Sequence, residues 1–174
     1  MTEHDELEST RTRLLHAAQE LASSERKLSL AERVIALGFG VSTAHVFDLL
    51  PLVHVAWADG EVQARERAAI LHLLEVRGVE RGCAAWVLFE ALLEEHPGQA
   101  YMDETLAVLC KVVSHNKGRV EALVDLCVRV AQAHGEHDQD PIDPRERQAL
   151  DEVAAALGPR AQTWIETRFR PESS

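Results

Sequence analysis

The chain has 174 residues, enough for one domain around a single hydrophobic core. Aliphatic residues and alanine dominate and aromatic residues make up only 5%, a composition typical of helices packed on helices. A net charge of −11 argues against nucleic acid as a partner and suits cations, basic proteins or simple solubility. No apolar run approaches the roughly 20 residues of a membrane span, and the acidic N-terminus has no leader pattern, so we expect a cytoplasmic protein.

The three cysteines, Cys83, Cys110 and Cys127, are an odd number without C-x-x-C spacing. Each lies in an apolar helical run. This pattern predicts buried free thiols in a reducing compartment rather than a disulfide framework.

Apolar residues recur at helical spacing along almost the whole chain, with glycine, proline and capping residues between the helices. Ser29 and Glu32 fit a capping box at the start of the second helix, and Ser42 is expected to cap the third. Pro51 lies inside the third helix, where it predicts a kink or a break. The predicted helices cover 2–22, 29–37, 42–58, 63–77, 82–95, 103–114, 119–133 and 144–157, and a last helix carries Trp164 and Phe169.

The stretch Ala58-Asp59-Gly60 is a corner between two of these helices, and Glu66 follows the aspartate by seven residues. A variant of the stretch returns later, with an offset that grows from 75 to 80 residues because the second loop is longer. The alignment sets Val55–Gly60 over Val130–Gly135 and Val62–Arg67 over Ile142–Arg147. Agreement across both helices predicts a duplication, with two helix–corner–helix units around a pseudo-twofold axis.

The pattern Ala58-Asp59-Gly60-x-Val62-x-x-x-Glu66, preceded by an apolar helix, resembles the signature of the TerB-like family of bacterial tellurite-resistance proteins. A related domain forms the N-terminal part of a membrane-anchored J-domain co-chaperone, but this chain has no His-Pro-Asp tripeptide. The resemblance implies an all-α fold, a compact bundle of eight or nine helices. It would span 41–170, with 1–40 as a helical segment on or leading into the core and 171–174 as a loose tail.

The family resemblance also implies a role in stress response and metal binding by acidic residues of the corner. Asp59 and Glu66 match that pattern directly, and His134 and Glu146 occupy the equivalent positions of the second copy. A calcium-binding EF-hand is excluded, because Val55 and Trp57 would stand where that loop needs carboxylates.

Helix capping is the competing explanation for these acidic residues. Asp59 could accept hydrogen bonds from free N–H groups at the start of the following helix. Glu66 and Glu146 stand where the third residue of a helix closes a capping box, and Asp143-Pro144 before Glu146 strengthens that interpretation. Gln63 is a poor N-cap residue, so capping explains Glu66 less well than Glu146, and the first copy is the better candidate for a functional site.

The loop 134–143 contains two histidines and several carboxylates, which would admit Mg²⁺, Ca²⁺, Mn²⁺ or Zn²⁺, but it fits no standard metal motif. A solvated acidic loop is the simpler explanation. The sequence contains no H-E-x-x-H, Gly-rich phosphate loop or G-x-S-x-G.

These observations favour a non-catalytic binding or scaffold module with a protein partner, and a divalent cation at Asp59, Glu66, His134 and Glu146. One alternative is a structural adaptor without metal. Another is a hydrolase that uses a metal held by the acidic loop.

Overall fold

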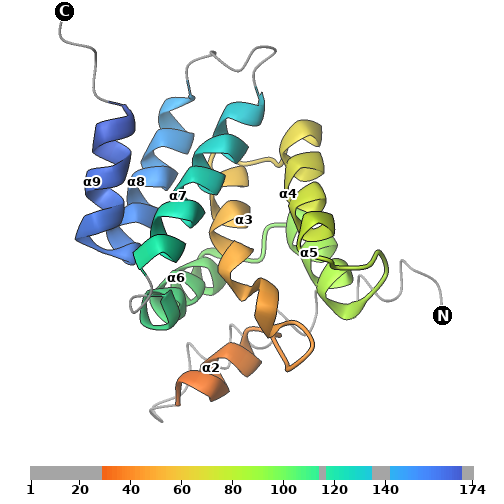
Figure 1. Ribbon diagram of the computed structural model, residues 1–174. Helices are drawn as coiled ribbons and strands as arrows, with labels where there is room; N and C mark the ends of the chain where they lie inside the picture. Colours follow the sequence, from red (N-terminus) through yellow and green to blue (C-terminus); the bar gives the residue numbers. More distant parts are fainter. Residues whose placement is uncertain (1–28, 114–116, 135–141, 170–174) are drawn as a thin grey trace, which may run out of the picture.

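The computed structural model describes residues 29–113, 117–134 and 142–169, and this part of the chain consists of helices joined by turns and loops, without strands (Figure 1). The all-α prediction is therefore confirmed. The predicted first helix over 2–22, most of the acidic loop and the tail 171–174 lie outside the described residues. The elements are α2 (Leu30–Ala36), η1 (Ala44–Leu49), α3 (Leu50–Ala56), α4 (Ala64–Val76), α5 (Ala84–Glu94), α6 (Gln99–Val113), α7 (Lys117–Ala131), η2 (Gln132–His134), α8 (Pro144–Leu157) and α9 (Pro159–Arg168).

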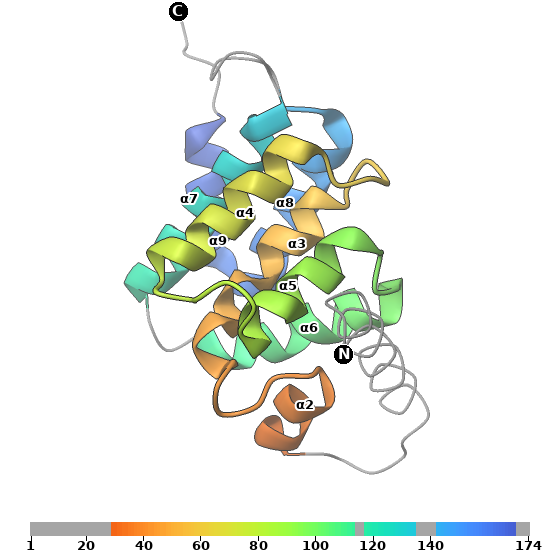
Figure 2. The same ribbon diagram turned by 90° about the vertical axis from the view of Figure 1, so that its right-hand side faces the viewer.

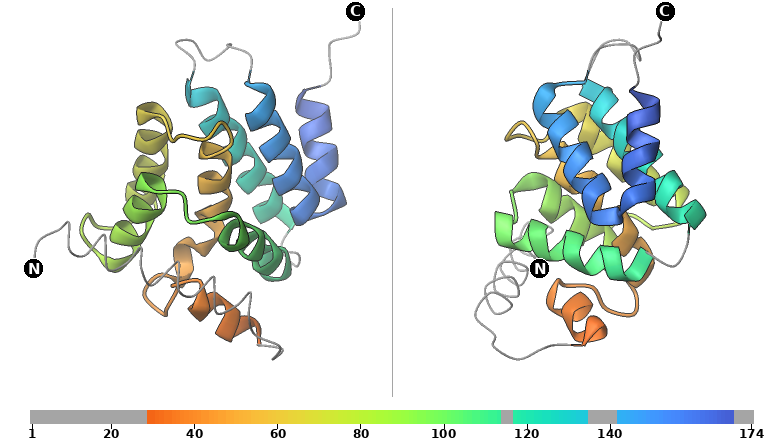
Figure 3. Two further views of the ribbon diagram at one scale, coloured as in Figure 1. Left: turned by 180° about the vertical axis from the view of Figure 1, so that it is seen from behind. Right: turned by 90° about the vertical axis from the view of Figure 1, so that its left-hand side faces the viewer.

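Helix α3 lies at the centre of the bundle, and all seven of its residues are buried. It packs against α4 on one side and against α7 and α8 on the other, while α6 crosses the end of this layer (Figures 1 and 2). Helix α9 covers the outer side of α7 and α8 (Figure 3). A helix that is apolar all round must be enclosed in this way, which is why the short α3 is the centre of the core.

The prediction at Pro51 is confirmed as a break. The segment before it, η1, is a 3-10 helix that ends at Leu49, and α3 begins at Leu50 with Pro51 in its first turn. In the first turn the missing N–H of proline costs no intrahelical hydrogen bond. The break leaves Asp48 buried, and its carboxylate accepts hydrogen bonds from Arg77 and Arg119.

Two sequence expectations are wrong. Ser42 does not cap the third helix; Thr43 occupies the N-cap position, and its hydroxyl accepts the Gly40 N–H at 2.8 Å instead of capping η1. The cysteines are not all buried, since Cys83 is exposed at the start of α5, Cys110 is half-buried and only Cys127 is fully enclosed. Helices α6 and α7 also begin earlier than predicted, at Gln99 and Lys117.

The capping box of α2 is confirmed, because Glu32 N–H donates to Ser29 Oγ and Ser29 N–H donates to Glu32 Oε2. Beyond α2 the chain enters the core through Leu37 and Phe39, both buried. The buried Tyr101 hydroxyl of α6 donates to the Leu37 carbonyl at 3.0 Å and fixes this entry. No helix in the described ranges is long and apolar enough to cross a bilayer.

Replacing Tyr101 with phenylalanine should lower the free energy of unfolding by about 1–2 kcal/mol, because the buried Leu37 carbonyl loses its side-chain donor. Urea unfolding followed by circular dichroism measures the change. Tyr101→Phe keeps the ring and therefore the packing, so an unchanged midpoint would show that this hydrogen bond does not hold the α2 segment to the core.

Candidate functional site

The first corner connects α3 to α4. Gly60 has a φ of +103°, the positive value that the predicted corner requires. The Asp59 carboxylate accepts the Glu61 N–H at 3.2 Å and lies 3.5 Å from the Gln63 side-chain nitrogen. The sequence predicts that Asp59 accepts N–H groups at the start of the following helix, but the hydrogen bonds that the structure describes for its carboxylate lie within the corner, before α4 begins at Ala64.

Glu66 and Glu146 close capping boxes at the starts of α4 and α8. Glu66 Oε2 accepts the Gln63 N–H at 2.8 Å, and Glu146 Oε2 accepts the Asp143 N–H at 3.0 Å. The two side chains are only 1% and 2% exposed. The capping role predicted for both glutamates is confirmed, with Gln63 accepted as an N-cap residue despite its low preference for that position.

The side chains of the two glutamates also interact with each other. In addition to burial, the negative charge of Glu146 and a hydrogen bond between the two side chains both raise the pKa of Glu66. Burial is the main cause that raises the pKa of Glu66 from 4.5 to about 7, and the negative charges of Glu146 and Asp59 add to it against the opposing Gln63 N–H. The contact joins equivalent residues of the two helix–corner–helix units, and the equivalent Ile70 and Leu150 are both 0% exposed.

The structure thus brings together three of the four predicted site residues, Asp59, Glu66 and Glu146. The backbone of His134 ends η2, and its side chain lies outside the described residues. Carboxylate oxygens suit hard cations such as Mg²⁺, which binds through one or two carboxylates and keeps several waters. Within the described ranges no three His, Cys, Asp or Glu side chains are placed to hold a metal ion on their own. The donor chemistry fits a hydrated hard cation but not a closed site for Zn²⁺.

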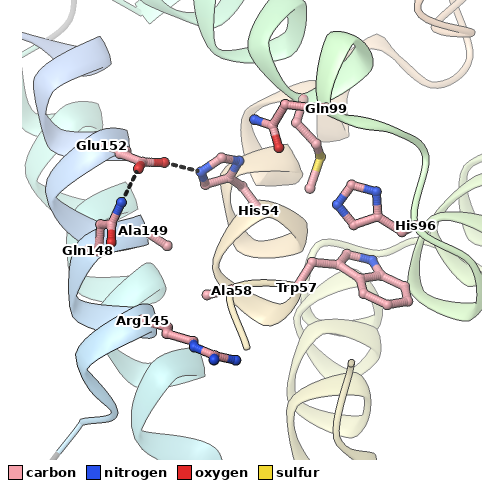
Figure 4. Close-up of a pocket in the computed structure, with 10 residues that line it drawn as sticks. His54, Trp57, Ala58, His96, Gln99, Arg145, Gln148, Ala149 and Glu152 are labelled. Carbon is pink, nitrogen blue, oxygen red and sulfur yellow. Dashed lines mark hydrogen bonds and ion pairs between the residues drawn. The ribbon is translucent and has the colours of Figure 1, made fainter. Parts of the chain in front are cut away.

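A pocket that the sequence did not predict opens beside this corner (Figure 4). Its volume is about 340 Å³, and it lies between the end of α3, the start of α6 and one face of α8. Polar side chains occupy its two ends, with Arg145 at one and His54 with Glu152 at the other. His54 and Glu152 are 98 residues apart, so no spacing in the sequence could join them.

The His54 end of the pocket is an imidazole–carboxylate pair. His54 is 9% exposed, its Nε2 lies 3.2 Å from Glu152, and its buried Nδ1 has no hydrogen-bond partner among the residues that the structure describes. Gln148 donates to the other Glu152 oxygen at 3.0 Å. The only sequence signal was a histidine inside an otherwise apolar helix, a pattern that a satisfied core histidine would also produce.

Trp57 and His96 form the side of the pocket (Figure 4). The Trp57 indole N–H donates to the Leu92 carbonyl at 2.8 Å, and its ring meets His96 edge to face at 5.2 Å between centroids. His96 Nδ1 accepts the Gly98 N–H at 2.9 Å. Burial lowers the pKa of His96, and the nearby His54 lowers it further, so His96 favours the neutral imidazole.

The fold and this junction define a class of protein: an all-helical bundle in which two helix–corner–helix units meet through their capping glutamates. The family model described as Tellurite resistance protein TerB matches residues 43–169, from the start of η1 to the end of α9. The chain belongs to this TerB family, as the corner motif indicated. Neither the curated proteins nor the solved structures give a significant match.

The glutamate pair should make stability fall as the pH rises. Glu66 has a pKa of about 7 in the folded chain against an ordinary value of 4.5, so between these values the folded state binds a proton that the unfolded state has lost. The stabilisation is complete below pH 4.5 and lost above pH 7, a change of about 3 kcal/mol for such a shift in pKa. Urea unfolding at pH 5 and pH 8 measures it.

Glu66→Gln is the matched variant, because glutamine imitates the protonated acid and keeps an oxygen for the Gln63 N–H. Wild type and Glu66→Gln should have similar stability at pH 5, and the variant should be the more stable at pH 8. Glu32→Gln is the control, since Glu32 closes an exposed capping box in α2. Equal pH dependence in wild type and Glu66→Gln would contradict the raised pKa of Glu66.

Proposed function

We propose that this chain is a non-catalytic cytoplasmic binding module of a bacterial, tellurite-resistance-like stress response, and that its acidic corner responds to a divalent cation. The TerB family match supports a role in a tellurite-resistance-like stress response. The contact between Glu66 and Glu146 supports the binding of a divalent cation. Two carboxyls buried in contact cannot both ionise without compensation. A proton is one compensation, and a divalent cation is a second.

The residues that would hold the cation are Glu66 and Glu146, with Asp59 supplying negative charge beside them. The cation would supply positive charge at the point where the two units meet, allowing both carboxyls to ionise. Mg²⁺, Ca²⁺ and Mn²⁺ suit an oxygen-only donor set that is completed by water, and Zn²⁺ would need histidine. Because each glutamate already accepts a backbone N–H, the same side chains couple cation binding to the starts of α4 and α8.

The non-catalytic part of the proposal rests on the same geometry. One oxygen of each carboxyl, Glu66 Oε2 or Glu146 Oε2, accepts a backbone N–H in a capping box, which is a structural role that requires no catalysis. A module of this kind acts through a protein partner that recognises the bound or the free state. The net charge of −11 favours a partner with a basic surface.

Thermal unfolding of chelator-treated protein, with and without millimolar Mg²⁺, Ca²⁺, Mn²⁺ or Zn²⁺, tests the cation. A hard cation at 100 times its dissociation constant adds about 2.7 kcal/mol, which raises the Tm by several degrees. The increase should be larger at pH 8 than at pH 6, because protons and cations compete for the same carboxyls.

The double variant Glu66→Gln and Glu146→Gln should lose the cation effect, whereas Glu32→Gln should retain it. If no cation raises the Tm at either pH, the metal part of the proposal is wrong and the glutamates only cap helices. A Tm increase that survives in the double variant would place the cation elsewhere.

A further inference from the structure

We propose that the pocket beside the corner binds a small organic anion, with the acidic group on Arg145 and a flat body along α8. The volume of about 340 Å³ falls within the roughly 300–1,000 Å³ of pockets that hold small molecules. An inorganic ion would leave most of this space empty. This site uses none of the carboxyls of the proposed cation site.

Arg145 provides the charge that recognises an acidic group. One of its N–H groups donates to the Asp59 carbonyl at 3.2 Å, which holds the guanidinium at the pocket mouth. Within the described ranges, no carboxylate forms an ion pair with this guanidinium. Arginine has five N–H donors in a planar fork, and a carboxylate or phosphate can accept two of them side by side.

The opposite end of the pocket sets the direction of the ligand. Arg145 and Glu152 are two turns apart on one face of α8, about 10 Å at 1.5 Å per residue. Glu152 would repel an anion, and its oxygens already accept hydrogen bonds from His54 and Gln148. The acidic group therefore belongs at Arg145, and the far end of the ligand should be neutral or a hydrogen-bond donor.

The wall of the pocket formed by Trp57 suits a flat ring. Trp57 is held in place by its hydrogen bond to Leu92 and by the edge contact with His96. Met102 and Ala149 also line the pocket and add apolar surface to it. A rigid aromatic wall binds a planar group at little cost in conformational entropy.

Titration of ¹⁵N-labelled protein with four probes tests this site, followed at the Trp57 indole N–H, which Trp57→Phe identifies. Benzoate and phenyl phosphate distinguish a carboxylate from a phosphate head. Benzylamine carries the opposite charge on the same ring, and inorganic phosphate has the head without the ring. We expect saturable shifts with benzoate or phenyl phosphate at millimolar concentration, and much weaker effects from the other two probes.

Arg145→Gln should weaken binding of the anionic probe at least about tenfold, as expected for the loss of a charged hydrogen-bond donor. Arg147→Gln removes the same charge two residues along α8, where Arg147 contacts Asp151 and Phe169, and should leave the affinity unchanged. Both variants change surface side chains, and circular dichroism verifies their fold. Glu66→Gln should bind the probe like wild type, which separates this site from the proposed cation site.

Three results would overturn the proposal. The first is the absence of saturation with both aromatic anions. The second is benzylamine binding as tightly as benzoate, and the third is equal affinity of Arg145→Gln and wild type for the anionic probe.

Discussion

Helices α4 and α8 each turn their third residue, Glu66 or Glu146, into the core, and the N–H groups of their half-buried N-cap residues, Gln63 and Asp143, need acceptors. An unpaired buried N–H costs about 1–3 kcal/mol, so each helix start needs its own acceptor. Glu66 and Glu146 meet this requirement from the third position of α4 and α8. Because the two buried side chains interact, satisfying both N–H groups places two carboxyls near each other in the core. The raised pKa of Glu66 is thus a consequence of burying the cap of α4 beside a second carboxyl.

The sequence predicted the features that depend on neighbouring residues. Asp143-Pro144 with Glu146 predicted the start of α8, and Pro51 predicted the break before α3, because capping and proline geometry act within one turn. The capping pattern gave a wrong prediction at Ser42. The adjacent Thr43 is the N-cap residue, its hydroxyl pairs with Gly40, and the chain continues as a 3-10 helix. Two adjacent hydroxyl residues offer equivalent caps in sequence, and the surrounding packing selects between them.

Contacts between distant segments could not be predicted in this way. The Asp59–Glu66 part of the candidate site follows from one motif, and the repeat implied that Glu146 is the equivalent of Glu66. That the two glutamates touch depends on the angle between the units, which no residue pattern records. The pocket was even less predictable from the sequence, because His54, His96 and Arg145 come from three separate segments.

Duplication also explains where a binding site can arise, because two identical halves would give two identical surfaces. One end of the pocket lies where the copies differ. The imidazole–carboxylate pair of His54 and Glu152 corresponds, through the offsets of 75 and 80 residues, to Arg129 and His72, which are both exposed. Two basic residues cannot form the charge-compensated contact that lets His54 sit 9% exposed beside the core. Of the pocket residues on α8, Arg145 and Ala149 have identical counterparts in the first copy, Arg65 and Ala69, whereas Glu152 does not. The end of the pocket that holds His54 and Glu152 is therefore where the two aligned segments differ, and the Arg145 end is where they agree.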